Sequence, residues 1–138
     1  MATYTKYNTF VENLLNKVFD LFGTTDTVKV ALASDAANYT TDNALADRTQ
    51  VANGGGYTTG GEDTQNDSTR TTTTVTETAV DVVWTGTTGF GPFTDVVRYD
   101  DTAASDQLIN DWPYGSSISI GIGETFTVDF GASVSTFT

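Results

Sequence analysis

The sequence predicts a mainly β fold, an antiparallel β-sandwich or jelly-roll-like barrel with one N-terminal α-helix. From residue 27 onward, apolar residues recur at every second position in roughly seven to nine short segments, which is the spacing of half-buried strands. Glycine-rich or polar turns separate these segments at regular intervals, as in sandwiches and barrels. A chain of 138 residues that is 38% hydrophobic has material for one packed core. We therefore expect a single domain over residues 1–138.

The N-terminal part of the chain contains the segment with helical periodicity. Apolar residues there recur at spacings of three and four, which places them on one wide helix face; they are Phe10, Val11, Leu14, Leu15, Val18, Phe19, Leu21 and Phe22. Thr9 and Glu12 have the spacing of a capping box, and Gly23 stands where a left-handed residue ends many helices. The pattern predicts a helix over residues 9–22 that either covers an open end of the domain or docks on a partner protein.

The first half of the predicted β-sandwich, which spans residues 27–138, alternates strands with loops. From Thr27 onward, the large apolar residues Val28, Val30 and Leu32 alternate with Lys29 and Ala31, which predicts a half-buried strand. A polar connection follows at 34–48, with one helical turn expected in its middle. The glycine-dense loop 53–61 lacks the Lys and the following helix of a phosphate-binding loop, so its glycines indicate tight turns or close backbone approach. The threonine run 69–76 favours a strand because Thr is β-branched.

The second half continues with further strands. Residues 80–84 predict a strand with three apolar side chains on one face. Residues 89–93, which contain two glycines and a proline, are expected to interrupt the sheet. Strands are then predicted at 94–100 and at 107–112, the latter ended by Pro113.

The clearest predicted hairpin comes near the end of the chain. Residues 118–122 and 126–130 alternate strictly and are joined by a turn at Gly123 and Glu124. A short strand at 133–137 follows. Period-two alternation places twelve side chains in the predicted core: Val28, Val30, Leu32, Val80, Val82, Trp84, Ile118, Ile120, Ile122, Phe126, Val128 and Phe130.

Composition restricts the chemistry that the chain can perform. It contains no Cys and no His, which excludes thiol nucleophiles, disulfides, Ser-His-Asp triads and most zinc sites. The net charge of −12 disfavours nucleic acid as a partner because phosphate would be repelled. No apolar stretch approaches the roughly 20 residues that span a bilayer. We therefore expect neither an enzyme, nor a nucleic-acid binder, nor a membrane protein.

Two acidic clusters are the candidates for a calcium site, because calcium prefers hard oxygen ligands. One consists of Asp63, Gln65, Asn66 and Asp67, and the other of Asp100, Asp101 and Asp106. Neither follows the spacing of an EF-hand, and acidic loops commonly serve only to keep a protein in solution. We expect no metal and no cofactor.

Three residues of the N-terminal arm, residues 1–8, are the candidate partner interface. Tyr4 and Tyr7 form an aromatic pair suited to anchoring in a groove of another protein, and Lys6 supplies one of only six positive charges. The arm shows no periodicity that would place it in the core. The alternative is an ordinary frayed terminus. Elsewhere, six aromatic residues are available for a sugar-binding platform: Tyr39, Tyr57, Trp84, Tyr99, Trp112 and Tyr114. Trp84 is expected in the core because it shares a strand face with Val80 and Val82, and Trp112 is expected to be partly exposed.

Several stretches, taken in order, resemble small β-rich structural proteins of tailed bacteriophages. The resemblance covers about residues 28–138, and the stretches that carry it are Leu45–Asp47, Asn53–Gly61, Asp81–Thr85, Gly91–Phe93, Val96–Asp101, Asp106–Ile109 and Gly123–Phe130. Each stretch is short, and it is their order along the chain that makes the resemblance moderately specific.

The resemblance implies a virion structural protein, most plausibly a capsid decoration (cement) protein on the outside of the head. Its expected partner is the major capsid protein, to which many copies would bind, in some cases as a homo-oligomer. The protein would be made in the bacterial host cytoplasm, and its lack of Cys suits that reducing compartment. The alternatives are a phage tail component (a tail-tube, adaptor or fibre-associated protein) and a carbohydrate-binding module.

Overall fold

A computed structural model describes residues 3–138 and is mainly β, with 44% strand, 7% helix, antiparallel sheets and one short α-helix near the N-terminus. The predicted fold class is confirmed. In chain order the elements are β1 (Thr5–Lys6), α1 (Phe10–Leu15), β2 (Val28–Ala33), the 3-10 turn η1 (Leu45–Asp47), β3 (Glu62–Asp63), β4 (Asp67–Thr71), β5 (Thr74–Thr78), β6 (Val82–Thr85), β7 (Phe90–Asp100), β8 (Leu108–Ile120), β9 (Thr125–Val128) and β10 (Ser135–Phe137).

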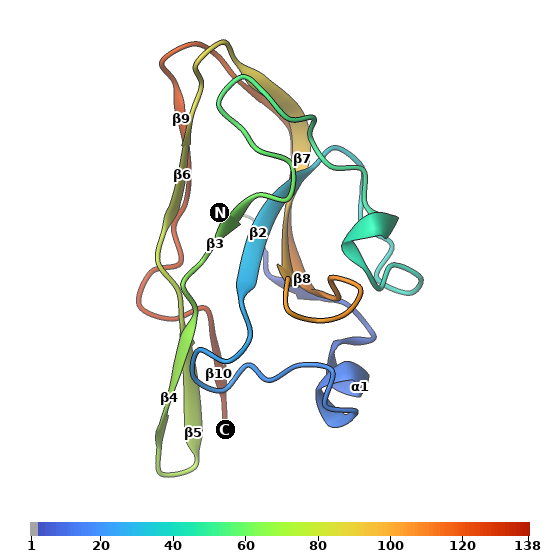
Figure 1. Cartoon of the computed structure of the whole chain (residues 1–138), viewed down its shortest axis with the longest axis vertical. Helices are drawn as coiled ribbons and strands as arrows, with labels where there is room; N and C mark the ends of the chain where they lie inside the picture. Colours follow the sequence, from blue (N-terminus) through green and yellow to red (C-terminus); the bar gives the residue numbers. More distant parts are fainter. Residues whose placement is uncertain (1–2) are drawn as a thin grey trace.

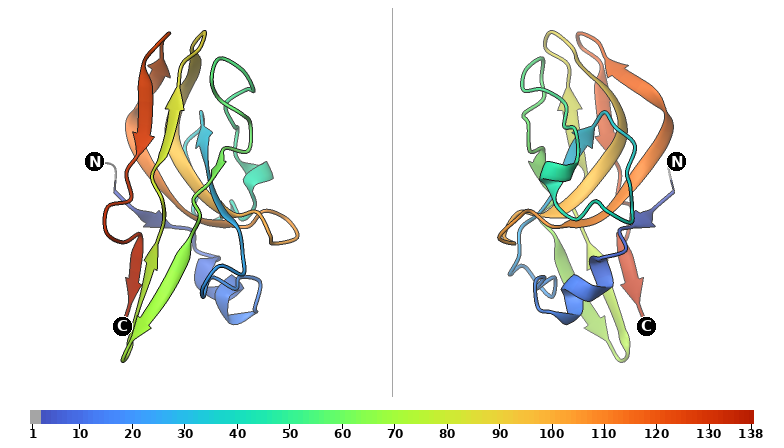
Figure 2. Two further views of the ribbon diagram at one scale, coloured as in Figure 1. Left: turned by 60° about the vertical axis from the view of Figure 1, so that its left-hand side comes forward. Right: turned by 90° about the vertical axis from the view of Figure 1, so that its right-hand side faces the viewer.

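The strands form two layers. One layer is a five-stranded sheet in the order β1-β8-β7-β2-β3. Facing it are the pair β6-β9 and, further along, the three-stranded sheet β10-β5-β4 (Figures 1 and 2). In Figure 1 β5 leads upward into β6, and β9 leads downward to β10, so the second layer is one long ribbon with a bend in its middle.

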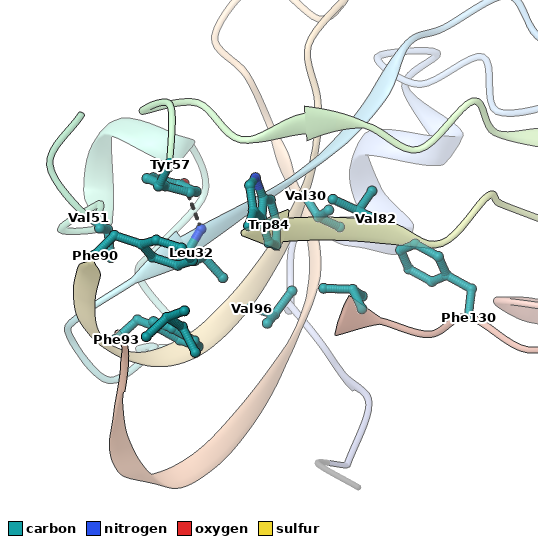
Figure 3. Packing of buried hydrophobic residues seen from close by; sticks show 12 residues of the cluster. Val30, Leu32, Val51, Tyr57, Val82, Trp84, Phe90, Phe93, Val96 and Phe130 are labelled. Carbon is teal, nitrogen blue, oxygen red and sulfur yellow. Dashed lines mark hydrogen bonds between the residues drawn. The ribbon is translucent and has the colours of Figure 1, made fainter. Parts of the chain in front are cut away.

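Aromatic and aliphatic side chains fill the space between the five-stranded sheet and the β6-β9 pair (Figure 3). Trp84 and Phe126 stack with their ring centroids 6.3 Å apart, and the Leu32 N–H donates to the Tyr57 hydroxyl at 2.9 Å. The loop that carries Tyr57 is thereby fastened to β2. This is the main core of the protein.

Ten of the twelve predicted core residues face inward. Seven are buried in the main core, with Ile118 and Phe126 partly buried against it, and Val28 is buried in a smaller cluster with Phe10, Phe19 and Ile109. Val80 and Ile122 are 53% and 77% exposed, so the prediction is wrong for these two. Each lies outside a strand, where alternation no longer fixes the direction of a side chain.

The predicted hairpin between residues 118–122 and 126–130 does not form. β8 pairs with β7 up to Ile120, and β9 pairs with β6, with Trp84 opposite Phe126. The turn between β8 and β9 therefore carries the chain from one layer to the other. Alternation identifies which face of a strand is buried but not which strand lies beside it.

The residues expected to interrupt strands lie within long ones. Gly91 and Pro92 belong to β7, and Pro113 belongs to β8 opposite Asp95. Register shifts on both sides of this region accommodate the missing proline N–H groups. Conversely, the threonine run that predicts one strand forms two, β4 and β5, which fold back on each other at Thr72.

The predicted helix over 9–22 is much shorter. α1 ends at Leu15 because Lys17 adopts φ of 59°, while the Val18 N–H bonds to the Asn13 carbonyl and the Lys17 N–H to the Leu14 carbonyl. This is the pattern of a Schellman C-terminus. Thr9 makes no side-chain capping bond, so the predicted capping box is also wrong. No helix within residues 3–138 is long and apolar enough to cross a bilayer.

Candidate functional site

The three residues predicted to contact a partner do not form one surface. β1 pairs with β8, which places Lys6 opposite Asn110. Tyr7 is only 2% exposed; its ring lies 5.4 Å from that of Tyr39, and its hydroxyl accepts a hydrogen bond from Arg48. Burial raises the pKa of Tyr7. Tyr7 is a core residue, and the prediction that it anchors a partner is wrong.

Tyr4 and Lys6 remain at the surface. Lys6 is exposed, with its Nζ atom 6.0 Å from the centre of the Phe10 ring, and Tyr4 contacts Trp112 edge-on at 5.9 Å. Met1 and Ala2 of the predicted arm lie outside the described residues. The sequence could not distinguish Tyr4 from Tyr7, because the residues that bury Tyr7 come from distant parts of the chain.

An apolar groove opens at the end of the sandwich where α1 lies. One wall is α1 and the segment that follows it, and the other is the sheet of β4, β5 and β10 (Figure 1). Its volume is about 320 Å³. We call it the end groove and define it by six apolar lining residues: Phe10, Leu14, Phe19, Phe22, Val75 and Phe137.

The rim of the end groove exposes large apolar side chains. Phe22 is 57% exposed, and Leu14 and Phe137 are each 39% exposed. Val11 and Leu15 add two further exposed apolar side chains on α1. Several large apolar side chains exposed around one groove are typical of a protein–protein contact. The wide apolar stripe of the predicted helix indicates one wall of the groove, whereas nothing in the sequence predicts that Val75 or Phe137 lies opposite it.

A neutralised carboxylate lies in the lining of the end groove. Glu77, next to the last residue of β5, accepts two hydrogen bonds from the buried guanidinium of Arg98 on β7. The Ser135 hydroxyl donates to the same carboxylate at 2.6 Å. Because the two charges cancel, this part of the lining presents little net charge to an incoming apolar group.

A second groove, also of about 320 Å³, lies between β8 and the chain around β9. Tyr4, Trp112, Tyr114 and Phe130 line it together with polar side chains such as Asp129. The Trp112 ring meets Phe130 edge-on at 5.9 Å. The structure thus brings one predicted arm residue, Tyr4, together with two of the six candidate sugar-platform residues, Trp112 and Tyr114. The candidates Tyr57 and Tyr99 are buried, as is Trp84, which was expected in the core.

The predicted acidic clusters use their oxygen atoms within the protein. The Asp63 carboxylate accepts the Gln65 N–H at 2.7 Å, and the amide of Asn66 bonds to the backbone of Val28 and Asp26. Asp101 pairs with Lys29 at 2.9 Å. Within residues 3–138 no group of three or more acidic side chains is arranged to hold a metal ion.

Chelation is accordingly expected to leave the melting temperature unchanged, because each acidic loop is held by its own backbone N–H groups. The measurement is thermal unfolding with and without EDTA, with calcium added back as the control. A fall of several degrees that calcium reverses would contradict this expectation and assign a site to one of the two loops.

Comparison of the chain with protein-family models, with curated proteins and with solved structures found no match.

Proposed function

We propose that the chain is a bacteriophage virion structural protein, a capsid decoration (cement) protein that binds the outside of the head and stabilises the shell. The class of phage structural protein is suggested by the short stretches between residues 28 and 138 that resemble such proteins and occur in the same order along the chain. The observation that carries the docking step is the end groove, whose exposed rim of Leu14, Phe22 and Phe137 gives the domain a ready apolar contact.

Charge is consistent with a position on the outside of the head. A protein of net charge −12 would be repelled by packaged DNA, so it suits the outer surface better than the lumen. Each copy that binds the folded shell adds its binding free energy to the stability of that shell. Many copies that each bind the shell weakly can therefore together increase its stability by a large amount.

The number of copies of the protein per particle tests whether it belongs to the head or to the tail. Particles of the phage that encodes the chain would be purified and the protein quantified against the major capsid protein by densitometry. A decoration protein is expected at hundreds of copies per particle. Tens of copies at most would contradict the proposal and favour the alternative of a tail adaptor or fibre-associated protein.

Substitution in the end groove tests the docking surface. Phe22→Ser and Phe137→Ser are expected to weaken binding to particles that lack the protein by about 1–4 kcal/mol, because each removes an aromatic anchor. Ile122→Ser is the matched control, since Ile122 is equally apolar and 77% exposed but lies in the β8–β9 turn at the other end of the molecule (Figure 1). If all three variants bind such particles with the affinity of the wild-type protein, docking through the end groove is contradicted.

A carbohydrate-binding module is the second candidate, and the aromatic groove around Trp112 favours it. Aromatic walls beside a carboxylate match the apolar faces and hydroxyl groups of a sugar ring. Titration of the protein with soluble glucan and N-acetylglucosamine oligomers, followed by tryptophan emission, tests this reading. Trp84 is buried, so a saturable change that is lost in Trp112→Phe would support it.

A further inference from the structure

A pair of buried carboxyl groups connects the segment that forms one wall of the end groove to the five-stranded sheet. Asp100, the last residue of β7, is fully buried, and Asp26, just before β2, is 7% exposed. Asp100 lies opposite Val28 in the pairing of β7 with β2, which brings its side chain next to Asp26, two residues before Val28. Asp26 also accepts the backbone N–H of Asp20, which lines the end groove beside Phe22.

The remaining contacts of Asp100 leave one oxygen for Asp26. Its Oδ1 atom accepts the N–H groups of Thr102 at 2.9 Å and Ala103 at 3.2 Å. Its Oδ2 atom is buried and receives no hydrogen bond from any N–H or hydroxyl group of the described residues. Burial and the repulsion between two adjacent like charges both favour the state in which one of the two carboxyl groups holds a proton.

The positively charged side chains near Asp26 and Asp100 form ion pairs with other carboxylates. On β7 itself, Arg98 is paired with Glu77 of β5. On β2, Lys29 is paired with Asp101, the residue after Asp100. From the loop before β4, Asn66 contributes only a neutral amide, which bonds to the Asp26 carbonyl. Among residues 3–138, no positive side chain is therefore seen to substitute for the proton between Asp26 and Asp100.

We propose that the proton shared by Asp26 and Asp100 is a latch that holds the segment 16–27, and with it the Phe19–Phe22 wall of the end groove, against the sheet. Loss of the proton leaves two adjacent buried negative charges, which push the segment away. The latch itself is a property of the isolated domain, whereas its effect on partner binding rests on the proposed docking through the end groove.

The direction of the pH effect follows from the sign of the shift. Burial, together with the hydrogen bond that protonated Asp100 donates to Asp26, raises the pKa of Asp100 to about 7, whereas an unfolded Asp titrates at about 3.9. The folded state therefore holds one more proton than the unfolded state between these values. The latch therefore contributes its full stability below about pH 4. This contribution falls steadily as the pH rises from about 4 to about 7, and above that the free energy of unfolding no longer depends on this group.

The test compares the purified wild-type protein with Asp100→Asn between pH 5 and 8.5. The asparagine keeps the Oδ1 acceptor and supplies an N–H to Asp26 without a titrating proton. Asp129→Asn is the matched control, because exposed Asp129 also accepts a backbone N–H two residues on, from Gly131. Asp26→Asn is a second variant in case Asp100→Asn does not fold.

Hydrogen exchange of the amides at residues 20–23, corrected for the intrinsic pH dependence, reports opening of the latch. In the wild type and in Asp129→Asn we expect the opening equilibrium to rise by up to roughly tenfold per pH unit from pH 5 to 7 and then to level off. The melting temperature is expected to fall over the same range. In Asp100→Asn both trends are expected to disappear.

Two results would overturn the proposal. One is an opening equilibrium that does not change between pH 5 and 7 in the wild type, or that changes equally in Asp100→Asn. The other is recovery of the wild-type melting temperature at pH 8 by added CaCl2, absent in Asp100→Asn, since the pair would then bind a cation in place of the proton. Neither measurement involves a capsid, so failure of the latch and failure of the docking proposal are distinguishable.

Discussion

Arg48→Met is expected to destabilise the protein by about 3–5 kcal/mol at pH 7, because it leaves buried carboxylates without their counter-charge. The Arg48 guanidinium is surrounded by acidic groups: it bonds to Asp95 at 2.7 Å and to Asp111 at 3.1 Å, and both of these carboxylates are buried. It also donates to the Tyr7 hydroxyl. Methionine fills a similar volume but carries neither charge nor donor, so the loss measured is that of the ion pairs together with the hydrogen bonds to the Tyr7 hydroxyl and the Asp35 carbonyl.

Urea denaturation at several pH values checks this prediction. Burial raises the pKa of Asp111, so this carboxyl becomes neutral at a higher pH than an ordinary Asp. The deficit of Arg48→Met is therefore expected to shrink as the pH falls from 7 towards 4, where the carboxylates left behind protonate. Arg70→Met, an exposed arginine on β4, is the matched control and is expected to cost about 0.5 kcal/mol or less. A deficit under about 1 kcal/mol at pH 7 would contradict the assigned role of Arg48.

The Arg48 cluster also marks a limit of sequence analysis. Its acidic partners come from residues 35, 42, 95 and 111, two in the connection before η1 and two on long strands of the main sheet. In the sequence each resembles an ordinary exposed Asp. The pairing of β7 with both β2 and β8, which places Asp95 opposite Ala33 and Asp111 opposite Val97, brings them together. Charge composition reports that acids are abundant but not which of them are buried.

Local periodicity predicted the faces of strands better than the ends of elements or their partners. Ten of the twelve predicted core side chains are inside because a strand that faces a core must alternate. The length of the helix was overestimated because the spacing of apolar residues continues past Lys17, where the helix has already ended. The backbone turns at Lys17, and the Phe19 ring then packs against the Phe10 ring with their centroids 5.7 Å apart. Spacing alone cannot distinguish a continuous helix from a short helix whose following loop covers the same apolar cluster.

The candidate site was predictable in part for the same reason. The apolar stripe that includes Leu14 and Phe22 indicated a surface in need of cover, and docking on a partner was one of the two interpretations of it. The opposite wall could not be inferred, because Val75 lies among threonines and Phe137 lies in a short strand near the end of the chain. Their proximity depends on β10 pairing with β5.

The glycine-dense loop gives the second large expected effect. Gly61 has φ of +70°, and a Cβ atom added there would lie 1.7 Å from the Val30 carbonyl oxygen and 2.8 Å from Ala31 Cα. These are backbone atoms of β2, which is hydrogen-bonded to β7 along its whole length and cannot move aside. Gly61→Ala must therefore displace the loop that carries Tyr57 away from the core. We expect a loss of about 3–5 kcal/mol, from the left-handed backbone and the overpacking together.

Gly123→Ala separates these two causes. Gly123 has a nearly equal φ of +77°, but a Cβ atom there would meet nothing within 4 Å. It is expected to cost only the left-handed penalty of about 1–2 kcal/mol. Urea unfolding of both variants measures the difference, which is the cost of the close approach between the loop and β2. Because the Leu32 N–H bonds to the Tyr57 hydroxyl, Gly61→Ala should also release that N–H to solvent exchange, whereas Gly123→Ala should not. Equal losses in the two variants, with the Leu32 amide still protected, would mean that the loop does not press against β2.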